Sequence, residues 1–427
     1  MLDIKRIREN FDEVVAGERR RNNEAYVELV KQARDLDVDR RRLLNESDAL
    51  KTERNTRSKE IGQLKKAGQD TTEVQAEVRK IGDAILEKDA AVREIEAKLQ
   101  EVMLRIPNVP NAEIPDGPDA SGNVVVRTIG KKPEFDFKPL DHLELGTKLG
   151  IFDLERAAKI TGTGFPMLVG VGSHLQRALI QYMLDLHTEK QGYTEVLPPF
   201  VVNSDSMRGT GQLPKMAEDM YHCEVDDYWL VPTAEVPVTN IYRDEILTQP
   251  LPIYLTAYTP CFRREAGSAG KDTRGIKRVH QFDKVEMVKF VEPETSYDEL
   301  EKLVQNAGDV LEGLGLYYHV LKLCTGDISF SCAKCYDLEL WAPAHEEWLE
   351  VSSCSNFEDF QARRLNCRYR GKDGKPRLVH TLNGSGVALP RLMIALLEQC
   401  QQADGSVLLP EAIWPYMRGI KKLEPIR

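Results

Sequence analysis

Arg263 and Glu265 are the first residues whose types and spacing suggest chemistry. They follow the strand-like run 254–262 and open onto a polar loop rich in Gly, Arg and Lys. Residues two apart on a strand share one face, so the two side chains should point the same way. Arg offers a planar fork to phosphate or carboxylate, and Glu accepts hydrogen bonds from amines. The pair indicates a site for an anionic ligand that carries an amine; a surface ion pair across a hairpin is the alternative.

Two further carboxylates stand in apolar, strand-like surroundings. Glu286 lies within residues 284–288 and Glu350 within residues 348–353. A carboxylate on the inner face of a strand is costly unless it meets a cation, a metal or a ligand, although strand alternation also permits both to point to solvent. Residues 380–386 (HTLNGSG) are predicted to form a small polar loop before the final helix, which carries Arg391 in its first turn. An ordinary helix start is the alternative there.

Two glycine-rich segments resemble nucleotide cradles only superficially. Residues 267–273 (GSAGKDT) fail the pattern G-x-x-x-x-G-K-[ST], because Glu265 stands where the first Gly belongs and Asp272 follows the Lys. Residues 162–164 (GTG) do not extend to G-x-G-x-x-G. A nucleotide bound by this chain would therefore need a different cradle.

The elements that must position these residues read as strands joined by short connections. Adjacent strands 254–262 and 279–290 flank the polar loop, which favours an antiparallel sheet over βαβ units. Helices are expected over residues 173–190 and 388–401, and further strands over residues 124–126, 195–197, 336–341 and 348–353. Four prolines and a glycine in residues 107–118 mark a linker. We therefore predict an N-terminal domain over residues 1–108 and a second, larger domain over residues 109–427.

A heptad pattern dominates the N-terminal part of the chain. Hydrophobic residues alternate in steps of four and three from Val74 to Ile106, with Lys88 as the one polar member, and a less pure row runs from Leu29 to Leu64. Gly68 can end the first helix, and Thr72 with Gln75 is expected to form a capping box that starts the second. So short a link predicts a long antiparallel coiled-coil hairpin over about residues 27–106. A helix pair lying on the core of its own domain is the alternative.

The charges of this hairpin are unevenly distributed. Its first helix is basic and carries polar residues in the seam itself, namely Arg40, Arg54 and Arg57, whereas its second helix is acidic. The basic side is either a solvated surface or a phosphate-binding edge. The three arginines in the seam indicate RNA contacts or an error in the assigned register.

Composition limits the remaining possibilities. The formal net charge of −10 does not indicate a nucleic-acid partner, so any nucleic-acid-binding site must be a local basic patch. No run of about 18 apolar residues exists, and the charged N-terminus lacks an apolar signal core, so we expect a cytoplasmic protein without membrane spans. Cys332 and Cys335 form a C-x-x-C without a second pair at suitable spacing, so we expect reduced thiols and no zinc.

Taken in order, the motifs resemble a seryl-tRNA synthetase of the bacterial type, which is a class II aminoacyl-tRNA synthetase. The likeness runs from the hairpin to the last helix, and its most specific markers are TAE (233–235), FRREAGSAGKDTRG (262–275), HQFDKVE (280–286), LCTGD (323–327), EVSSCSN (350–356) and NGSG (383–386). The resemblance implies an α+β chain: the hairpin plus a class II catalytic domain on an antiparallel β-sheet flanked by helices. It also implies a homodimer formed through a first class motif near residues 173–199.

The chemistry implied by this resemblance is the ATP-dependent activation of L-serine and its transfer to tRNA-Ser. Arg263, Glu350 and Arg391 are the implied catalytic residues: Arg263 would bridge the α-phosphate and the serine carboxylate, and Arg391 would hold the γ-phosphate. Glu350 and Ser353 look like ligands for Mg²⁺, a hard cation that prefers oxygen. Glu286 would hold the serine ammonium. The rest of the implied serine pocket is Thr233, Ala234, Glu235, Asn383 and Ser385.

The resemblance also assigns the nucleotide site. Glu265 would read the adenine amino group and Phe282 would stack on the base; the other implied ATP-binding residues are Arg264, Val279, Val351 and Ser352. The hairpin would grip the long extra arm of tRNA-Ser, and tRNA-Sec is a second expected substrate. Two alternatives stand beside this reading: a relative that loads a non-tRNA carrier, which would typically lack the long hairpin, and a non-catalytic coiled-coil scaffold, in which the charged site residues would be lost.

Overall fold

The computed structural model describes residues 1–266 and 275–426. The chain divides into two compact units, residues 1–107 and residues 108–427. The expected phosphate-loop lookalike at residues 267–273 lies outside the described residues. No described helix is both long enough and apolar enough to cross a membrane.

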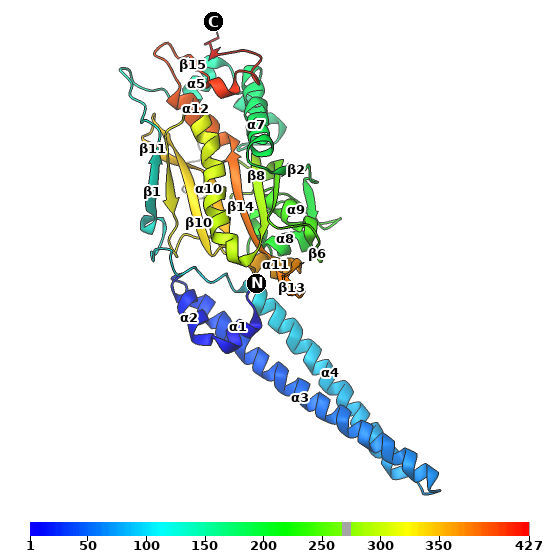
Figure 1. The fold of residues 1–427 in the computed structure, drawn as a ribbon. Coiled ribbons are helices and arrows are strands. Elements are labelled where there is room, and N and C mark those ends of the chain that lie inside the picture. Colours follow the sequence, from blue (N-terminus) through cyan, green and yellow to red (C-terminus); the bar gives the residue numbers. More distant parts are fainter. Residues whose placement is uncertain (267–274, 427) are drawn as a thin grey trace. The chain divides into compact units, whose positions relative to one another are not determined.

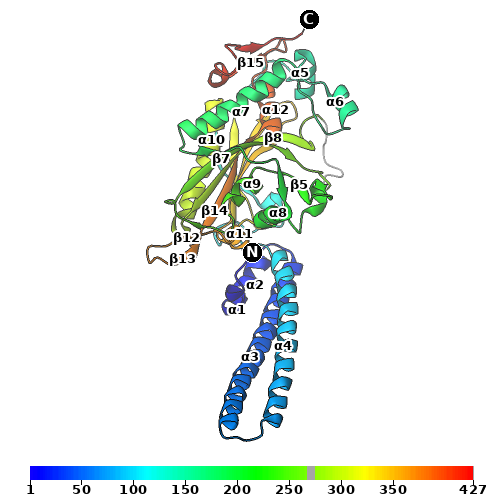
Figure 2. The ribbon, with the colours of Figure 1, turned by 90° about the vertical axis from the view of Figure 1, so that its right-hand side faces the viewer.

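The first unit is entirely helical. Two short helices, α1 (Ile4–Glu9) and α2 (Phe11–Arg19), precede the long helices α3 (Glu24–Lys66) and α4 (Thr72–Arg105). The Arg8 guanidinium of α1 donates to the buried Asp37 carboxylate of α3 at 2.8 Å. The two long helices run side by side as an antiparallel hairpin (Figures 1 and 2). The predicted coiled-coil hairpin is therefore confirmed.

The turn of the hairpin follows one prediction and departs from another. Gly68 adopts φ +68°, the left-handed conformation that suits glycine just beyond a helix end. The predicted capping box of Thr72 and Gln75 is wrong, because α4 already begins at Thr72. The Asp70 carboxylate accepts from the Thr72 N–H at 3.0 Å, and the Gln75 amide donates to the Thr71 hydroxyl at 2.7 Å.

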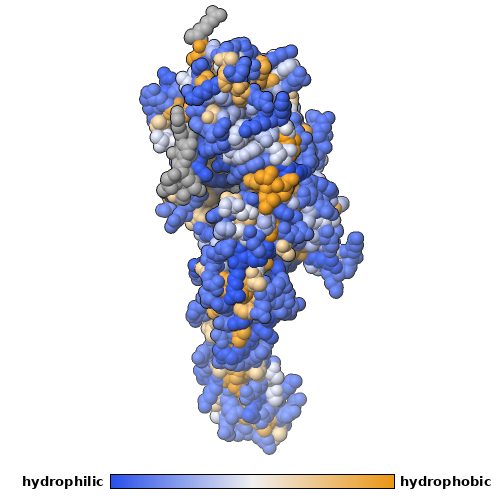
Figure 3. All heavy atoms as spheres, turned by 90° about the vertical axis from the view of Figure 1, so that its left-hand side faces the viewer, coloured by the Kyte–Doolittle hydropathy of each residue, from blue (hydrophilic) through white to orange (hydrophobic). Residues whose placement is uncertain are grey.

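Two of the three arginines in the first seam, Arg40 and Arg57, pair across the hairpin. Arg40 Nε lies 3.0 Å from a Glu96 carboxylate oxygen, and Arg57 Nε lies 3.6 Å from one of Glu77. The seam register is thus correct, and these polar members are ion pairs that help to fix the register of the hairpin. The visible surface of this unit is mostly hydrophilic, with a narrow broken apolar row (Figure 3), as a two-position seam requires.

The second unit is built on an eight-stranded sheet in the order β1-β9-β10-β11-β14-β8-β7-β2. Neighbouring strands are antiparallel except β2 and β7, which are parallel. The predicted antiparallel sheet is confirmed. Its strands are β1 (Val124–Ile129), β2 (Thr194–Glu195), β7 (Ile253–Phe262), β8 (Gln281–Val291), β9 (Tyr318–Lys322), β10 (Lys334–Ala342), β11 (Glu347–Asn356) and β14 (His380–Ala388).

Three helices pack against this sheet and form the main core with it (Figure 1): α7 (Val171–Glu189), α10 (Ser296–Gly313) and α12 (Leu389–Gln399). Strand alternation divides the side chains of β8 between core and cavity. Val285 and Met287 are fully buried in the core, whereas Lys284 and Glu286 line a cavity. The same sequence period therefore builds the hydrophobic core and leaves charged side chains for a site.

The prediction of a polar loop over residues 380–386 is wrong. These residues belong to β14, which lies between β11 and β8 near the middle of the sheet. Small and polar residues suggested a loop, but neighbours on both sides supply the backbone hydrogen bonds. Gly384 and Gly386 also sit too close to other side chains for a Cβ: one placed on Gly386 would lie 2.2 Å from His187 Nε2. Glycine therefore meets a packing requirement here.

Smaller elements complete the unit around this sheet. The remaining helices are α5 (His142–Leu149), α6 (Leu154–Ile160), α8 (Ser204–Thr210), α9 (Glu235–Thr239) and α11 (Phe360–Leu365). The remaining strands are β3 (Val201–Asn203), β4 (His222–Cys223), β5 (Tyr228–Leu230), β6 (Ile246–Leu247), β12 (Arg368–Arg370), β13 (Pro376–Leu378), β15 (Val407–Leu408) and β16 (Lys422–Leu423).

Candidate functional site

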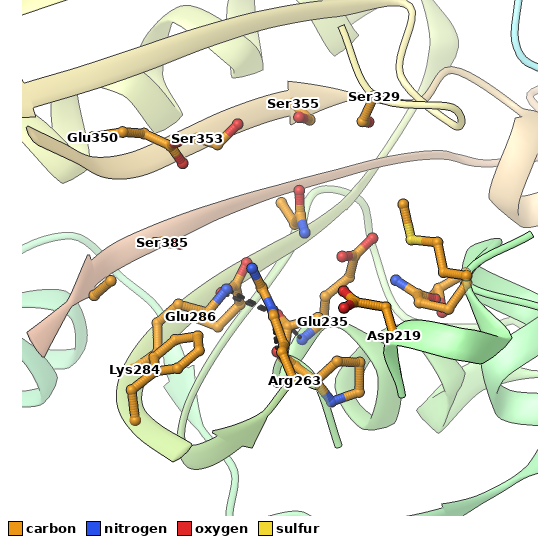
Figure 4. Close-up of a pocket in the computed structure, with 18 of the residues that line it drawn as sticks. Asp219, Glu235, Arg263, Lys284, Glu286, Ser329, Glu350, Ser353, Ser355 and Ser385 are labelled. Atoms are coloured by element: carbon orange, nitrogen blue, oxygen red, sulfur yellow. Dashed lines mark hydrogen bonds and ion pairs between the residues drawn. The ribbon is translucent and has the colours of Figure 1, made fainter. Parts of the chain in front are cut away.

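A cavity of about 600 Å³ lies on the face of the sheet formed by β8, β11 and β14. Glu350, Ser353 and Ser355 lie along one strand on one side, and Arg263, Lys284 and Glu286 lie across from them (Figure 4). All of the predicted site residues line this cavity except Ala234, Arg264 and Ser352. Residues far apart in the sequence therefore converge on one space large enough for a small ligand.

The three exceptions lie close by. Ala234 is fully buried in a hydrophobic cluster, and the Ser352 hydroxyl donates to the Ser385 carbonyl at 2.6 Å. The Arg264 side chain is exposed, and its backbone N–H donates to the Asp219 carbonyl at 2.8 Å. Ala234 and Ser352 thus support the wall of the cavity, whereas Arg264 is exposed and is not among the described residues that line it.

A β-bulge explains how Glu350 and Ser353 come to share the cavity. Residues three apart on a regular strand face opposite sides of the sheet. Opposite β10, however, the register skips one residue: Leu338 pairs with Ser352, and Glu339 pairs with Glu350. The extra residue, Val351, reverses the alternation. A carboxylate and a hydroxyl oxygen therefore face the same space.

Arg263 is held from several directions just beyond the end of β7. Its Nε donates to the Pro232 carbonyl at 3.2 Å, and its backbone N–H donates to the His280 carbonyl at 2.9 Å. The guanidinium carbon lies 5.3 Å from the centre of the Phe282 ring. Because these contacts already fix the guanidinium, binding an anion costs little further side-chain entropy.

Glu265 occupies an uncommon backbone conformation beside Arg263. Its φ is +50°, which costs energy for a residue with a Cβ. The next residue, Ala266, donates its N–H to the Asp219 carboxylate at 2.9 Å, and Arg278 Nη1 lies 3.5 Å from a Glu265 carboxylate oxygen. Asp219, which sequence reasoning missed, therefore anchors this turn and also lines the cavity.

Lys284 is a second residue that sequence reasoning missed. Its Nζ lies 2.5 Å from a Glu286 carboxylate oxygen and donates to the Thr233 hydroxyl at 2.9 Å. Lys284 and Glu286 are both buried, so the buried carboxylate has a cation close by. The available signal was the alternation in the motif HQFDKVE, which puts Lys284 on the same face as Glu286.

Glu235 is a second buried carboxyl in the cavity, and its immediate partner is neutral. The amide of Gln361 donates to its Oε1 at 2.7 Å. Burial, together with the nearby Glu286 carboxylate, raises the pKa of Glu235 to about 7. The two carboxyls thus differ: one faces an ammonium and the other an amide.

Arg391 approaches the cavity from the first turn of α12. Its Nη1 donates to the Glu350 carbonyl at 2.8 Å and lies 3.5 Å from a Glu350 carboxylate oxygen. The Arg391 side chain is partly exposed, and this contact with Glu350 is available for exchange with a more strongly charged anion.

The oxygen atoms that line the cavity provide part of the coordination shell of a hard cation. Glu350 and Ser353 offer oxygen atoms to the cavity, but within residues 1–266 and 275–426 no group of three or more His, Cys, Asp or Glu side chains could hold a metal ion. A Mg²⁺ ion keeps several ligands from water or from substrate phosphates. The residues therefore fit an ion that arrives with a phosphate-bearing ligand.

Comparisons with known families cover both units. Residues 1–110 match the family described as seryl-tRNA synthetase N-terminal domain. Residues 221–400 match the class II core domain of tRNA synthetases for G, H, P, S and T. The chain is 53% identical to the serine–tRNA ligase of Geobacter sulfurreducens, over 99% of this chain and 100% of that one. The chain belongs to the seryl-tRNA synthetase family.

Other members of the seryl-tRNA synthetase family give the same result. The serine–tRNA ligase of Alkaliphilus oremlandii is 54% identical over 99% of both chains. The crystal structure of the seryl-tRNA synthetase from Pyrococcus horikoshii, complexed with ATP, superposes with a TM-score of 0.96 at 38% identity and full coverage of both chains. The family fold therefore extends over both units, and a member with this fold binds ATP.

Proposed function

We propose that this chain is a serine–tRNA ligase that activates L-serine with ATP and transfers it to the 3′ end of tRNA-Ser. The observation that carries the proposal is the convergence of Arg263, Glu286, Glu350 and Arg391 on one cavity, in a chain that matches serine–tRNA ligases from end to end. In the first step a serine carboxylate oxygen attacks the α-phosphorus, and diphosphate leaves with the electrons of the broken P–O bond. In the second step a terminal ribose hydroxyl attacks the seryl carbonyl, and AMP leaves.

The chain's residues position these groups and neutralise their charge. Arg263, anchored through its Nε, presents its remaining nitrogens to the α-phosphate and the serine carboxylate. Arg391 leaves its contact with Glu350 to hold the γ-phosphate. Phosphoryl transfer needs alignment and charge stabilisation more than a protein nucleophile, which suits this set of side chains. Phe282 and Glu265 hold the adenine, one by stacking and the other at its amino group.

Serine is held by the polar residues at the opposite end of the cavity. Glu286 binds the substrate ammonium, and Thr233, Glu235, Asn383 and Ser385 surround the hydroxyl. A buried site that hydrogen-bonds a hydroxyl rejects alanine, because alanine would leave the polar groups of the site unpaired. Glu350 and Ser353 would hold Mg²⁺, which when bound would offset the negative charge of the ATP phosphates.

Partners beyond the small substrates follow from the same proposal. The helical hairpin of residues 27–106 holds the long extra arm of tRNA-Ser, and tRNA-Sec is a further substrate where the host has one. The exposed apolar side chain of Leu197 follows β2, and burying residues 173–199 against a second copy would form a homodimer that also covers the adjacent exposed Phe200 and Val201. The same proposal includes a cytoplasmic location, where tRNA and ATP are available.

The deciding experiment is ATP–diphosphate exchange with a panel of amino acids, followed by tRNA charging. We expect exchange with serine and transfer to tRNA-Ser, and sedimentation as a dimer. An ATP–diphosphate exchange rate that does not depend on serine would overturn the proposal. Exchange without transfer to tRNA would favour a relative that loads another carrier, and no exchange at all would favour a non-catalytic scaffold. Charging tRNA-Sec in parallel decides that substrate separately.

A further inference from the structure

A chain of buried hydrogen bonds reaches Glu235 from outside the cavity. The Thr381 hydroxyl donates to Gln361 Oε1 at 2.7 Å. Gln361 Nε2 in turn donates to Glu235 Oε1 at 2.7 Å and to the Thr210 carbonyl at 3.3 Å. Gln361 is 1% exposed and Thr381 is fully buried, and neither is among the described residues that line the cavity. These two residues therefore act on a ligand through the cavity wall, at the Thr210 carbonyl and above all at the charged group they contact, Glu235.

The surroundings of Gln361 allow only one orientation of its amide. A side-chain amide can be turned over, which exchanges its two donors for an acceptor. Turned over here, Oε1 would face the Thr210 carbonyl and the Glu235 carboxylate, and three acceptors would meet in a buried space. In the observed orientation, Gln361 Oε1 accepts a hydrogen bond from the Thr381 hydroxyl. The amide is thus locked with its N–H groups toward Glu235.

This lock decides which form of Glu235 the site favours. An N–H donor stabilises the ionised carboxylate and lowers its pKa, opposing the rise that burial and Glu286 cause. The Glu286 carboxylate instead faces a charged partner, the Lys284 ammonium, 2.5 Å away. Of the two carboxyls, Glu235 is therefore the one whose proton and direction depend on an uncharged neighbour.

We propose that Gln361, oriented by Thr381, is a positioning residue that sets the specificity of the cavity for a hydroxyl-bearing amino acid. It favours the ionised form of the Glu235 carboxyl and aims that group so that it accepts a hydrogen bond from the substrate hydroxyl. The inference rests on the proposed function, in which Glu235 reads the serine side chain. It predicts that changes outside the cavity alter the recognition of serine without altering that of ATP.

The test compares Gln361→Leu and Thr381→Val with the wild type in ATP–diphosphate exchange. Both variants should raise the KM for serine about tenfold while the KM for ATP stays within about twofold, because a hydrogen bond to a charged group is lost only on the serine side. The preference for serine over alanine, as a ratio of kcat/KM values, should fall about tenfold. The acid limb of the pH profile of kcat/KM for serine should move to higher pH, since Glu235 loses the donor that lowers its pKa.

Two further variants separate positioning from general stability. Thr381→Ser keeps the hydroxyl and should restore the KM for serine. Gln401→Leu removes another buried glutamine, which bonds to the carbonyls of Leu140 and Glu398 away from the cavity. It should lower the melting temperature and leave the KM for serine unchanged.

The outcomes distinguish this inference from the proposed function. A wild type without serine-dependent exchange overturns the proposed function, and the inference with it. A wild type that exchanges normally, beside folded Gln361→Leu and Thr381→Val variants whose serine KM, alanine discrimination and pH profile are unchanged, overturns the inference alone. Parallel rises in the KM for serine and for ATP would show a merely structural role and overturn it as well.

Discussion

The pKa of Glu235 links the substrate pocket to the stability of the fold. Its value of about 7 lies above the ordinary 4.5, because burial and the Glu286 carboxylate disfavour the charged form. The folded state therefore binds more protons than the unfolded state between these two values, and stability falls as the pH rises through that window. Below about pH 4.5, the pKa of Glu235 in the unfolded state, this residue does not lower the free energy of unfolding. Above about pH 7 its destabilising effect is complete.

Replacing this carboxyl should therefore stabilise the protein in one pH range only. We expect Glu235→Gln to raise the free energy of unfolding by about 1–3 kcal/mol at about pH 8 and by much less at about pH 4. Urea unfolding at the two pH values measures the difference, with Glu411→Gln on the exposed surface as the control. A gain of equal size at both pH values would contradict the assigned pKa. Serine activation should fall in the same variant.

Arg263 and Arg264 form a natural matched pair for testing the anion site. Arg263 lines the cavity, whereas the adjacent Arg264 side chain is exposed and lies outside the lining. Arg263→Lys keeps the charge but loses the planar fork, so kcat/KM for ATP–diphosphate exchange should fall about 100- to 1000-fold. Arg264→Lys should stay within about threefold of the wild type. Comparable losses in both variants would mean that Arg264 also reaches the nucleotide.

At the scale of the elements, the arginines of α3 separate into two kinds. Arg40 lies within 3.2 Å of carboxylate oxygens of both Asp37 and Glu96. Arg54 forms no ion pair in the described part of the chain, although it occupies the same seam. An arginine without a protein partner is the better candidate for an RNA phosphate contact.

The two kinds should respond differently to substitution. Arg54→Ala should raise the KM for tRNA several-fold, with a weaker dependence on salt concentration, and leave exchange with serine unchanged. Arg40→Ala should instead destabilise the hairpin by about 0.5–1 kcal/mol, because Glu96 is half-exposed and the buried Asp37 keeps its other partner, Arg8. Charging kinetics at two salt concentrations and helix melting by circular dichroism measure these effects. If Arg40→Ala alone weakened tRNA binding, the assignment would be reversed.

The elements also show what could be predicted from the sequence. Helices α3 and α4 and most strands of the sheet follow from hydrophobic periodicity, because burial on one face leaves a direct trace in the pattern. Strand β14 was missed because its Asn, Gly and Ser residues are typical of loops, and its place depends on two neighbouring strands distant in the sequence. The bulge at Val351 leaves no such trace, yet it puts Glu350 and Ser353 on one face. Lys284, Gln361 and Thr381 went unpredicted for a similar reason: their roles depend on partners that only the fold brings close.

At the scale of the whole molecule, the two compact units suggest that amino-acid activation and tRNA binding are separate functions of separate units, which a truncation can test. Every residue assigned to serine or ATP lies in the unit of residues 108–427, and the proposed grip on tRNA lies in the unit of residues 1–107. The contacts within the hairpin show where to cut. Arg40 and Glu96 face each other across α3 and α4, so removing residues 41–95 and joining the two positions by a short Gly-Ser linker keeps that ion pair and the helices α1 and α2 packed beside it.

This shortened chain should form seryl-adenylate at a rate within about twofold of the full chain, because no group that touches serine or ATP is removed. Its kcat/KM for charging tRNA-Ser should fall at least about 100-fold, since the phosphate contacts along the hairpin are lost together. Exchange and charging assays on one preparation measure both quantities, and a melting curve of the shortened chain checks that the second unit is intact. Equal losses of adenylation and charging would mean that the hairpin is needed for the chemistry itself. Undiminished charging would mean that tRNA is recognised by the second unit, and the basic side of α3 would then be only a solvated surface.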